Sequence, residues 1–359
     1  MKKLIILLLV IIPFNTYALT DSSKGSIVMD VDSGRILYQK NSNTSMLIAS
    51  TTKLMTFLVA NKYADDKLNS KITVGEEVLK AYGTNMYLSI SEEITLRDLL
   101  YGLMLRSGND ASIEIAYLVA GSIDDFVSLM NLEANNLGML NTNFKNPHGL
   151  DEETKNYSTA YDLAILTRTL ALKYPLFTKI AGAKYYNFKT NLKSYALINR
   201  AKIIFDYKKI TTAKTGYTPL AGKSLITTAN NNDLNLVMVS LNNPNHYEEQ
   251  KNMYEYFFKT YKNYKLLDKN NFHISNVFNS SYEIKNNFTY PLTKEEAKKV
   301  ETKVIINKKD NILGSIQVIL NDDVIHEELI YKKETKKTKK NIFKKIFTKI
   351  INFFKKSNH

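Results

Sequence analysis

The sequence of 359 residues contains no cysteine, which excludes disulfides, iron–sulfur clusters, thiolate zinc sites and cysteine nucleophiles. Proline and glycine are scarce, with 6 and 13 residues, whereas 44% of the residues are hydrophobic and 23% are charged. This composition excludes a collagen-like, mucin-like or wholly disordered chain and is typical of a globular protein. The length allows two ordinary domains, or one large domain with a small appendage.

Several catalytic motifs are also missing. The sequence has no G-x-G-x-x-G dinucleotide fingerprint, no G-x-S-x-G nucleophile elbow and no H-E-x-x-H zinc motif. The stretch from Gly216 to Ser224 resembles a phosphate-binding loop, but five residues separate Gly216 from Gly222 where the motif needs four. One inserted residue would misdirect the backbone N–H groups that hold a phosphate, so we reject a nucleotide site.

The net charge of +14 is distributed unevenly along the chain. Ten units of it lie in residues 332–359, which hold 11 lysines and one glutamate, and two more lie on Lys2 and Lys3. The remainder of the chain therefore carries only +2, which argues against a body that binds nucleic acid.

Residues 1–18 have the pattern of a secretory signal peptide. Lys2 and Lys3 precede an apolar run from Leu4 to Phe14, and small residues predict cleavage after Ala18. The run has eleven residues, far fewer than the ~20 that a membrane span needs. We therefore expect an exported protein.

Residues 19–264 alternate between strand-like and helix-like segments, and we expect them to form one domain. The patterns predict a hairpin over 25–41, helices over 46–60, 96–105, 110–119, 158–171 and 247–261, and strands over 224–228 and 234–241. Ser122 with Asp125 predicts the start of a further helix. Residues 265–331 hold short strand-like runs and predict a small all-β domain, followed by a basic linker over 332–340.

The last segment, residues 341–359, is amphipathic. On a helical wheel at ~100° per residue, the Ile and Phe side chains of residues 342–356 occupy one half and the Lys, Thr and Asn side chains the other. Such segregation is typical of an interfacial helix, and about 22 Å of helix is too short to cross a ~30 Å hydrocarbon core. We expect residues 341–356 to bind an anionic membrane surface; packing on a protein partner is the alternative.

Three short motifs occur in a fixed order. S-x-x-K is Ser50–Lys53, S-x-N is Ser107–Asn109 and K-T-G is Lys214–Gly216. Each is weak alone, and a second S-x-N begins at Ser240, but that copy follows K-T-G and is eliminated. In this order and at these separations the three motifs together are specific.

The first motif has a physical rationale. A helix places residues three apart on one face, so the amine of Lys53 can reach the hydroxyl of Ser50. A serine needs an adjacent base to become a nucleophile, and lysine can serve only if its pKa falls. Burial and a second cation such as Lys214 would both lower that pKa. Backbone N–H groups at the start of the Ser50 helix could stabilise an oxyanion.

These motifs resemble those of the serine D-alanyl-D-alanine carboxypeptidases, the low-molecular-mass penicillin-binding proteins. The resemblance covers nearly the whole chain and includes residues 29–37, 97–112, 146–150 and 214–222. It implies the α/β (α+β) fold of penicillin-binding proteins and serine β-lactamases, with an antiparallel sheet flanked by helices. It also implies the small β domain and the C-terminal amphipathic helix.

The same resemblance implies roles for the motif residues. Ser50 would attack the carbonyl of the penultimate D-alanine of a peptidoglycan stem peptide, with Lys53 as the general base. Ser107 and Lys214 would pass a proton to the leaving D-alanine, and Asn109 would hold the substrate backbone. Water activated by Lys53 would then hydrolyse the acyl-enzyme, and β-lactams would acylate Ser50.

Substrate binding is also implied by the family. Lys214 and Thr215 of the Lys214–Gly216 motif, with Arg200, would hold the terminal carboxylate, and the N–H groups of Ser50 and Tyr217 would form the oxyanion hole. No metal or cofactor is implied. For Arg200, a plain surface charge is an equal alternative.

The sequence departs from the family at two places, and other functions stay open. Position 217 is often His in the family, and residues 245–247 lack the further arginine of some relatives. We interpret His148 as a structural turn residue. The alternatives are a D,D-endopeptidase, a weak β-lactamase and an inactive wall-binding scaffold; class A β-lactamases use S-D-N and E-x-x-L-N motifs, which are absent here.

Overall fold

The computed structural model describes residues 19–272, 274 and 282–333. These residues form two compact units that divide between Lys262 and Asn263, two residues before the boundary that the composition predicts. The expected signal peptide, the linker beyond Lys333 and the amphipathic segment lie outside the described residues. No helix of the described part is long and apolar enough to cross a membrane.

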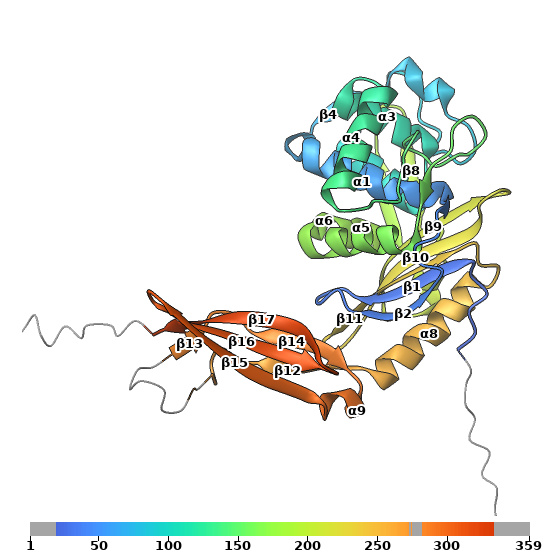
Figure 1. The fold of residues 1–359 in the computed structure, drawn as a ribbon. Helices are drawn as coiled ribbons and strands as arrows, with labels where there is room; N and C mark the ends of the chain where they lie inside the picture. The colour runs from blue at the N-terminus through green and yellow to red at the C-terminus, as the bar shows by residue number, and fades with distance from the viewer. Residues whose placement is uncertain (1–18, 273, 275–281, 334–359) are drawn as a thin grey trace, which may run out of the picture. The chain divides into compact units, whose positions relative to one another are not determined.

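A five-stranded antiparallel sheet is the centre of the first unit (Figure 1). Its strand order is β2 (Ile36–Lys40), β1 (Gly25–Asp30), β11 (Leu234–Leu241), β10 (Gly222–Asn231) and β9 (Ile210–Thr218). The predicted hairpin and the two predicted strands are present as β1–β2 and β10–β11. Strand β9, which carries the K-T-G motif, therefore lies at an edge of the sheet.

Helices cover both faces of this sheet (Figure 1). Helix α8 (His246–Thr260) packs on one face, and α5 (Ala160–Lys173) packs on the other. Strand β11 shows why both faces are buried, because Val237 and Val239 join the α5 side while Leu236 and Met238 join the α8 side. A strand that alternates between two apolar layers belongs in the middle of a domain.

The helical part surrounds α1 (Lys53–Tyr63), whose first eight residues are all buried. A helix that is apolar all round belongs in a core. The other helices of this unit are α2 (Leu96–Tyr101), α3 (Asn109–Ala120), α4 (Ile123–Asn136), α6 (Pro175–Ala181) and α7 (Ile203–Asp206). The 3-10 turns are η1 (Ala49–Thr52), η2 (Asp65–Lys67) and η3 (Glu76–Lys80), and a π-helical turn, η4, spans Gly102–Arg106. The first unit also contains three two-stranded sheets among its described residues: β3 (Met46–Leu47) with β6 (Tyr157–Ser158), β4 (Lys71–Thr73) with β5 (Glu93–Thr95), and β7 (Tyr185–Lys189) with β8 (Ser194–Ile198).

The predicted first residues of the helices agree with the structure at Ser122 but not at two other helices. The predicted cap at Ser122 is confirmed, because its Oγ accepts a hydrogen bond from the N–H of Asp125 at 3.1 Å. The prediction that Ser158 opens the next helix is wrong by one residue: Thr159 caps α5, since Ser158 pairs with Met46 in β6. The helix predicted over 46–60 likewise begins later, because its first two residues form β3.

The second unit is β-rich, as predicted, and its described residues include a single-turn helix, α9 (Lys294–Ala297). A four-stranded antiparallel sheet has the order β13 (Tyr282–Ile284), β17 (Asp323–Lys332), β16 (Ile312–Leu320) and β15 (Val300–Lys309). Strands β12 (Lys262–Leu267) and β14 (Phe288–Leu292) pair separately. A small apolar core holds the unit together: Leu267, Ile284, Leu313, Ile316, Val318 and Ile330.

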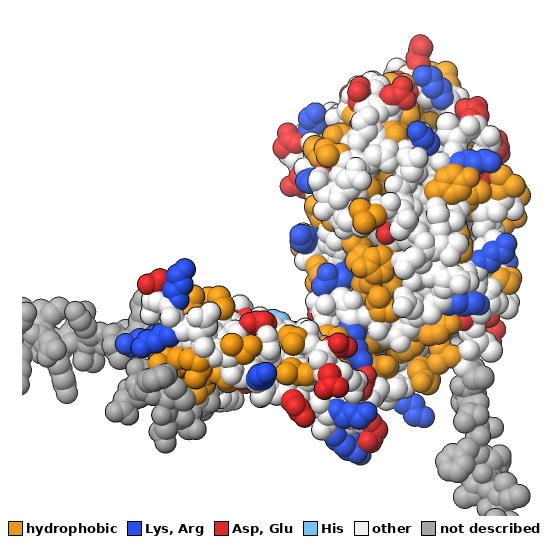
Figure 2. Space-filling view, viewed as in Figure 1, with side chains coloured by type: hydrophobic (Ala, Val, Ile, Leu, Met, Phe, Trp, Pro, Cys, Tyr) orange, Lys and Arg blue, Asp and Glu red, His pale blue; other side chains and the backbone are white. Residues whose placement is uncertain are grey.

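On the face drawn in Figure 2, basic and acidic side chains are interspersed over the first unit. This distribution agrees with the nearly neutral body that the charge arithmetic predicts. That face shows no basic patch of the kind that binds nucleic acid.

The loop after α4 passes beneath η1 at very close range. Gly149 has φ +90°, and a Cβ there would lie 1.9 Å from the carbonyl oxygen of Ala49. The loop is held by Asn146, whose Oδ1 accepts a hydrogen bond from the N–H of Gly149 at 2.6 Å. Asn156 ties the same loop to the end of η1 by donating to Thr52 Oγ1 at 3.0 Å. Only glycine fits this contact.

We predict that Gly149→Ala destabilises the protein more than Gly121→Ala does. Gly121 also has a positive φ, +78°, but an added Cβ meets nothing within 4 Å. The control should therefore cost only the left-handed strain, about 1–2 kcal/mol, while Gly149→Ala should cost about 1–3 kcal/mol more for displacing Ala49. Urea unfolding followed by circular dichroism measures both; equal losses would contradict the close contact.

Candidate active site

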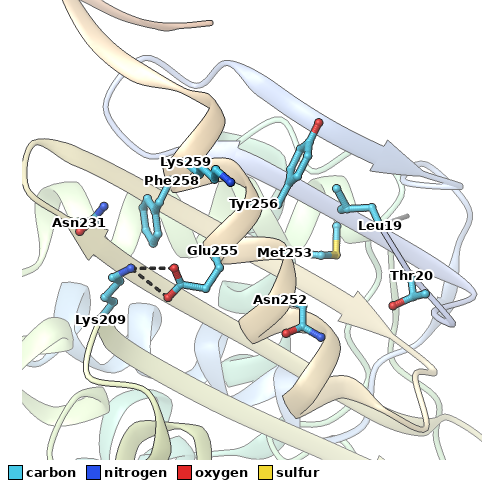
Figure 3. A pocket seen from close by; sticks show the side chains of 10 residues that line it. All are labelled: Leu19, Thr20, Lys209, Asn231, Asn252, Met253, Glu255, Tyr256, Phe258 and Lys259. Carbon is cyan, nitrogen blue, oxygen red and sulfur yellow. Dashed lines mark hydrogen bonds and ion pairs between the residues drawn. The ribbon is translucent and has the colours of Figure 1, made fainter. Parts of the chain in front are cut away.

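Two cavities of the first unit differ in their chemistry. The larger, about 860 Å³, lies along α8 (Figure 3), and Lys209 and Glu255, which both line it, form an ion pair at 3.0 Å. The smaller, about 400 Å³, gathers six of the predicted site residues: Ser50, Ser107, Arg200, Thr215, Gly216 and Tyr217. Lys53, Asn109 and Lys214 lie buried beside these residues and are linked to them by hydrogen bonds.

Ser50 stands on the strained turn η1. Ala49 before it has φ +46°, an uncommon conformation for a residue with a side chain. Strand β9 runs directly against this turn, because a Cβ on Gly216 would lie 3.0 Å from the oxygen of Ile48 and 3.2 Å from the nitrogen of Thr51. The glycine of K-T-G thus allows the edge strand to approach the turn that carries Ser50.

The amino group of Lys53 is fully buried next to Ser50. Its Nζ lies 3.2 Å from Ser50 Oγ and donates to Asn109 Oδ1 and to the carbonyl oxygen of His148, both at 2.7 Å. Burial, and then the charge of Lys214, hold the pKa of Lys53 well below its usual value, with Asp110 opposing. The neutral amine has two hydrogens for these two acceptors, which leaves its lone pair for the hydroxyl proton of Ser50.

Ser107 and Lys214 form a second pair. Ser107 follows the π-helical turn η4 with φ +61°, and Lys214 Nζ donates to its Oγ at 2.9 Å. Lys214 also donates to the carbonyl oxygen of Thr215 at 2.8 Å. Burial, and then the charge of Arg200, lower the pKa of Lys214 to about 7. This amine can therefore give or take a proton near neutral pH.

Asn109 is buried, and both ends of its amide are used within the protein. Its Oδ1 accepts from Lys53, and its Nδ2 donates to the carbonyl oxygen of Tyr82 at 2.6 Å. In this structure Asn109 thus positions the base and the loop that contains Tyr82. Its expected contact with the substrate backbone would have to share the same Nδ2.

Arg200 and Tyr217 lie at the rim of the cleft. Arg200 is exposed and donates from Nη1 to Thr84 Oγ1 at 3.1 Å, and its backbone N–H donates to Leu105. Tyr217 is 64% exposed. The structure therefore brings all nine predicted residues to one place.

Other residues at the site were not predicted as site residues. His148 is a turn residue as interpreted, since its Nδ1 accepts from the N–H of Leu150, but its carbonyl oxygen also holds Lys53. No side-chain pattern could reveal a role for a backbone oxygen. Lys223, His246 and Tyr247 line the cleft as well, and only the pairing of β10 with β9 and the start of α8 place them there.

The comparisons with known proteins agree with this geometry. A family model described as D-alanyl-D-alanine carboxypeptidase matches residues 14–245. The chain belongs to this family. The family, the fold and the enzyme class that the motifs predict, a serine-type peptidase of the penicillin-binding class, are thereby confirmed.

Individual relatives support the assignment. The carboxypeptidase DacF of Bacillus subtilis is 35% identical over 262 residues, which cover 71% of this chain and 67% of DacF. DacC of Escherichia coli is 34% identical over 228 residues, covering 60% of this chain and 55% of DacC. Penicillin-binding protein 5 from Haemophilus influenzae superposes with a TM-score of 0.74 at 25% identity, over 87% of this chain and 96% of that one.

We predict that Lys53 makes stability depend on pH. A lowered pKa in the folded state means that the unfolded chain binds more protons, so stability rises with pH from that lowered pKa up to 10.5. The free energy of unfolding of the wild type minus that of Lys53→Met should rise by about 1.4 kcal/mol per pH unit in this window. Urea titrations from pH 7 to 10 measure the slope.

Lys62→Met is the matched control. Glu133 raises the pKa of Lys62, so the stability from this pair is constant below 10.5 and is lost only as pH rises through the raised pKa. The free energy of unfolding of the wild type minus that of Lys62→Met should therefore not change between pH 7 and 10. A flat difference for Lys53→Met as well would show that Lys53 is charged in the folded protein.

Proposed function

We propose that this protein removes the terminal D-alanine from peptidoglycan stem pentapeptides through an acyl-enzyme on Ser50. The observation that carries the proposal is the buried amine of Lys53, 3.2 Å from Ser50 Oγ with both of its hydrogens committed to other acceptors. Such an amine keeps one lone pair free, and this lone pair can accept the hydroxyl proton of Ser50.

In the acylation step, Ser50 Oγ attacks the carbonyl carbon of the penultimate D-alanine while its proton moves to Lys53 Nζ. The oxyanion forms beside the N–H groups of Ser50 and Tyr217. Ser50 supports this role because it lies in the first turn of the η1–α1 segment, where N–H groups have no helical acceptor.

The peptide C–N bond then breaks, and the leaving nitrogen takes a proton from Ser107 Oγ. Lys214 then donates a proton to Ser107 Oγ in its place. A Lys214 pKa of about 7 suits this donation. Lys53 has gained one proton and Lys214 has lost one, so exchange between the two buried amines restores the starting state. Water activated by neutral Lys53 hydrolyses the ester and frees Ser50.

The carboxylate that ends the substrate would bind Thr215 and Arg200. Both line the cleft with Ser50, and Arg200 is a cation at its rim. Endopeptidase or weak β-lactamase activity would use the same residues, and the products distinguish these reactions. An inactive scaffold would have no use for two buried lysines, whose desolvation is costly.

We predict that the wild type converts a pentapeptide-bearing muropeptide to free D-alanine plus the tetrapeptide, and that penicillin adds its own mass to Ser50. Ser50→Ala should lose both reactions, because the ester forms on the Oγ that this change removes. Chromatography of the products and peptide mapping after penicillin treatment measure the two effects.

Ser128→Ala is the matched control, since Ser128 lies in α4 and is bonded only to the carbonyl oxygen of Asp124. It should react like the wild type. Labelling of Ser50→Ala at the wild-type level would contradict the nucleophile, and cleaved cross-links instead of free D-alanine would establish an endopeptidase.

We also propose that the protein is exported and held at the outer face of the cytoplasmic membrane by residues 341–356. These residues lie outside the described part, so the support is their sequence pattern, with lysines on one half of the helical wheel and Ile and Phe on the other. Each lysine near anionic headgroups adds ~1 kcal/mol of attraction.

Deleting residues 341–359 should abolish sedimentation with anionic vesicles and leave the acylation of Ser50 unchanged, because the cleft residues of the described part lie between Ser50 and Tyr247. Vesicle sedimentation and penicillin labelling measure the two properties. A truncated protein that still sediments would contradict the anchor, as would a full-length protein that ignores anionic vesicles.

A further inference from the structure

One cation of the cleft has no role in the mechanism above. Lys223 lines the cavity together with Ser50, Thr215 and Arg200, and it is exposed. Its backbone is fixed on both sides, by pairing with Tyr217 across the β9–β10 ladder and by the N–H of Asn243, which donates to its carbonyl oxygen at 2.7 Å. The side chain therefore leaves a rigid strand at a defined point of the cleft.

The register directs Lys223 toward the expected carboxylate site. Leu225 pairs with Thr215, and Lys223 pairs with Tyr217, so all four side chains are on the face of the sheet that α8 covers. Lys223 is thus the diagonal cross-strand neighbour of Thr215. Diagonal neighbours have Cβ atoms about 7–8 Å apart, a gap that a long side chain bridges.

The surroundings of Lys223 lack a negative charge. No Asp or Glu lines this cleft, and within the described residues neither Lys223 nor Arg200 forms an ion pair. His246 also lines the cleft, and burial together with the charge of Lys223 lowers its pKa, which keeps that ring neutral at pH 7. Two cations that line the cleft together with Thr215 and have no ion-pair partner there attract an anion.

We propose that Lys223 supplies a second cationic contact to the terminal carboxylate of the substrate, from the β10 side of the cleft, and so selects ligands with a free carboxylate. This inference rests on the proposed function. Arg200 and Thr215 bind the carboxylate, and Lys223 Nζ donates a further hydrogen bond to it from β10. Residues 245–247 contain no arginine that could make this contact, so we assign it to Lys223.

The first test compares steady-state kinetics of the full chain on an N-acylated peptide that ends in D-Ala-D-Ala. Lys223→Met should raise KM about 3- to 10-fold and keep kcat within twofold, because the carboxylate is held alike in the ground and transition states. Lys223→Arg should restore KM to within twofold. Lys208→Met is the control. Lys208 is exposed and lies two residues before the start of β9, so this change removes the same charge and should alter neither KM nor kcat.

The second test separates carboxylate recognition from a general effect on the cleft. Penicillin and its carboxyl methyl ester are compared as acylating agents, and Lys223→Met should slow acylation by the acid about 3- to 10-fold but acylation by the ester by less than twofold. Equal slowing of both, or kinetics like those of Lys208→Met, would overturn the role of Lys223. If the wild type itself were not acylated at Ser50, the proposed function would fail, which is a different result.

Discussion

The removal of the Lys53 amino group from water is the constraint on which the active site depends. Three segments far apart in the sequence meet to enclose it: η1 with Ser50, the start of α3 with Asn109, and the loop with His148. Each contributes one oxygen around the same nitrogen. Because an ammonium ion would be costly at such a place, the enclosure itself favours the neutral amine that the proposed base requires.

The same enclosure explains the tight backbone beneath the site. Gly149 is pressed against the carbonyl of Ala49 so that the neighbouring carbonyl of His148 can reach Lys53. Gly216 allows β9 to approach η1 from the other side. The positive φ of Ala49 between these two contacts is strain that the surrounding structure maintains, as is common where a nucleophile must be presented.

Much of this arrangement could be predicted from the sequence, because it depends on local patterns. The i, i+3 spacing of Ser50 and Lys53, the β1–β2 hairpin and the cap at Ser122 each follow from a few adjacent residues. What could not be predicted depends on distant pairing. The shift of the α5 cap to Thr159 follows from the β3–β6 pair, and the place of Lys223 in the cleft follows from the register of β10 on β9.

The positive charges form a series that leads from the rim to the base. Burial lowers the pKa values of Lys214 and Lys53 most, and the charge of Arg200 lowers that of Lys214 further, as the charge of Lys214 does that of Lys53. Each cation thus favours the neutral form of the next one inward. An anion bound at the rim offsets the charge of Arg200 and shifts Lys214 toward the protonated form that the leaving amine needs. Two lysines with different pKa values can then serve as base and acid in one turnover, and transfer of a proton from Lys53 to Lys214 afterwards restores the starting state.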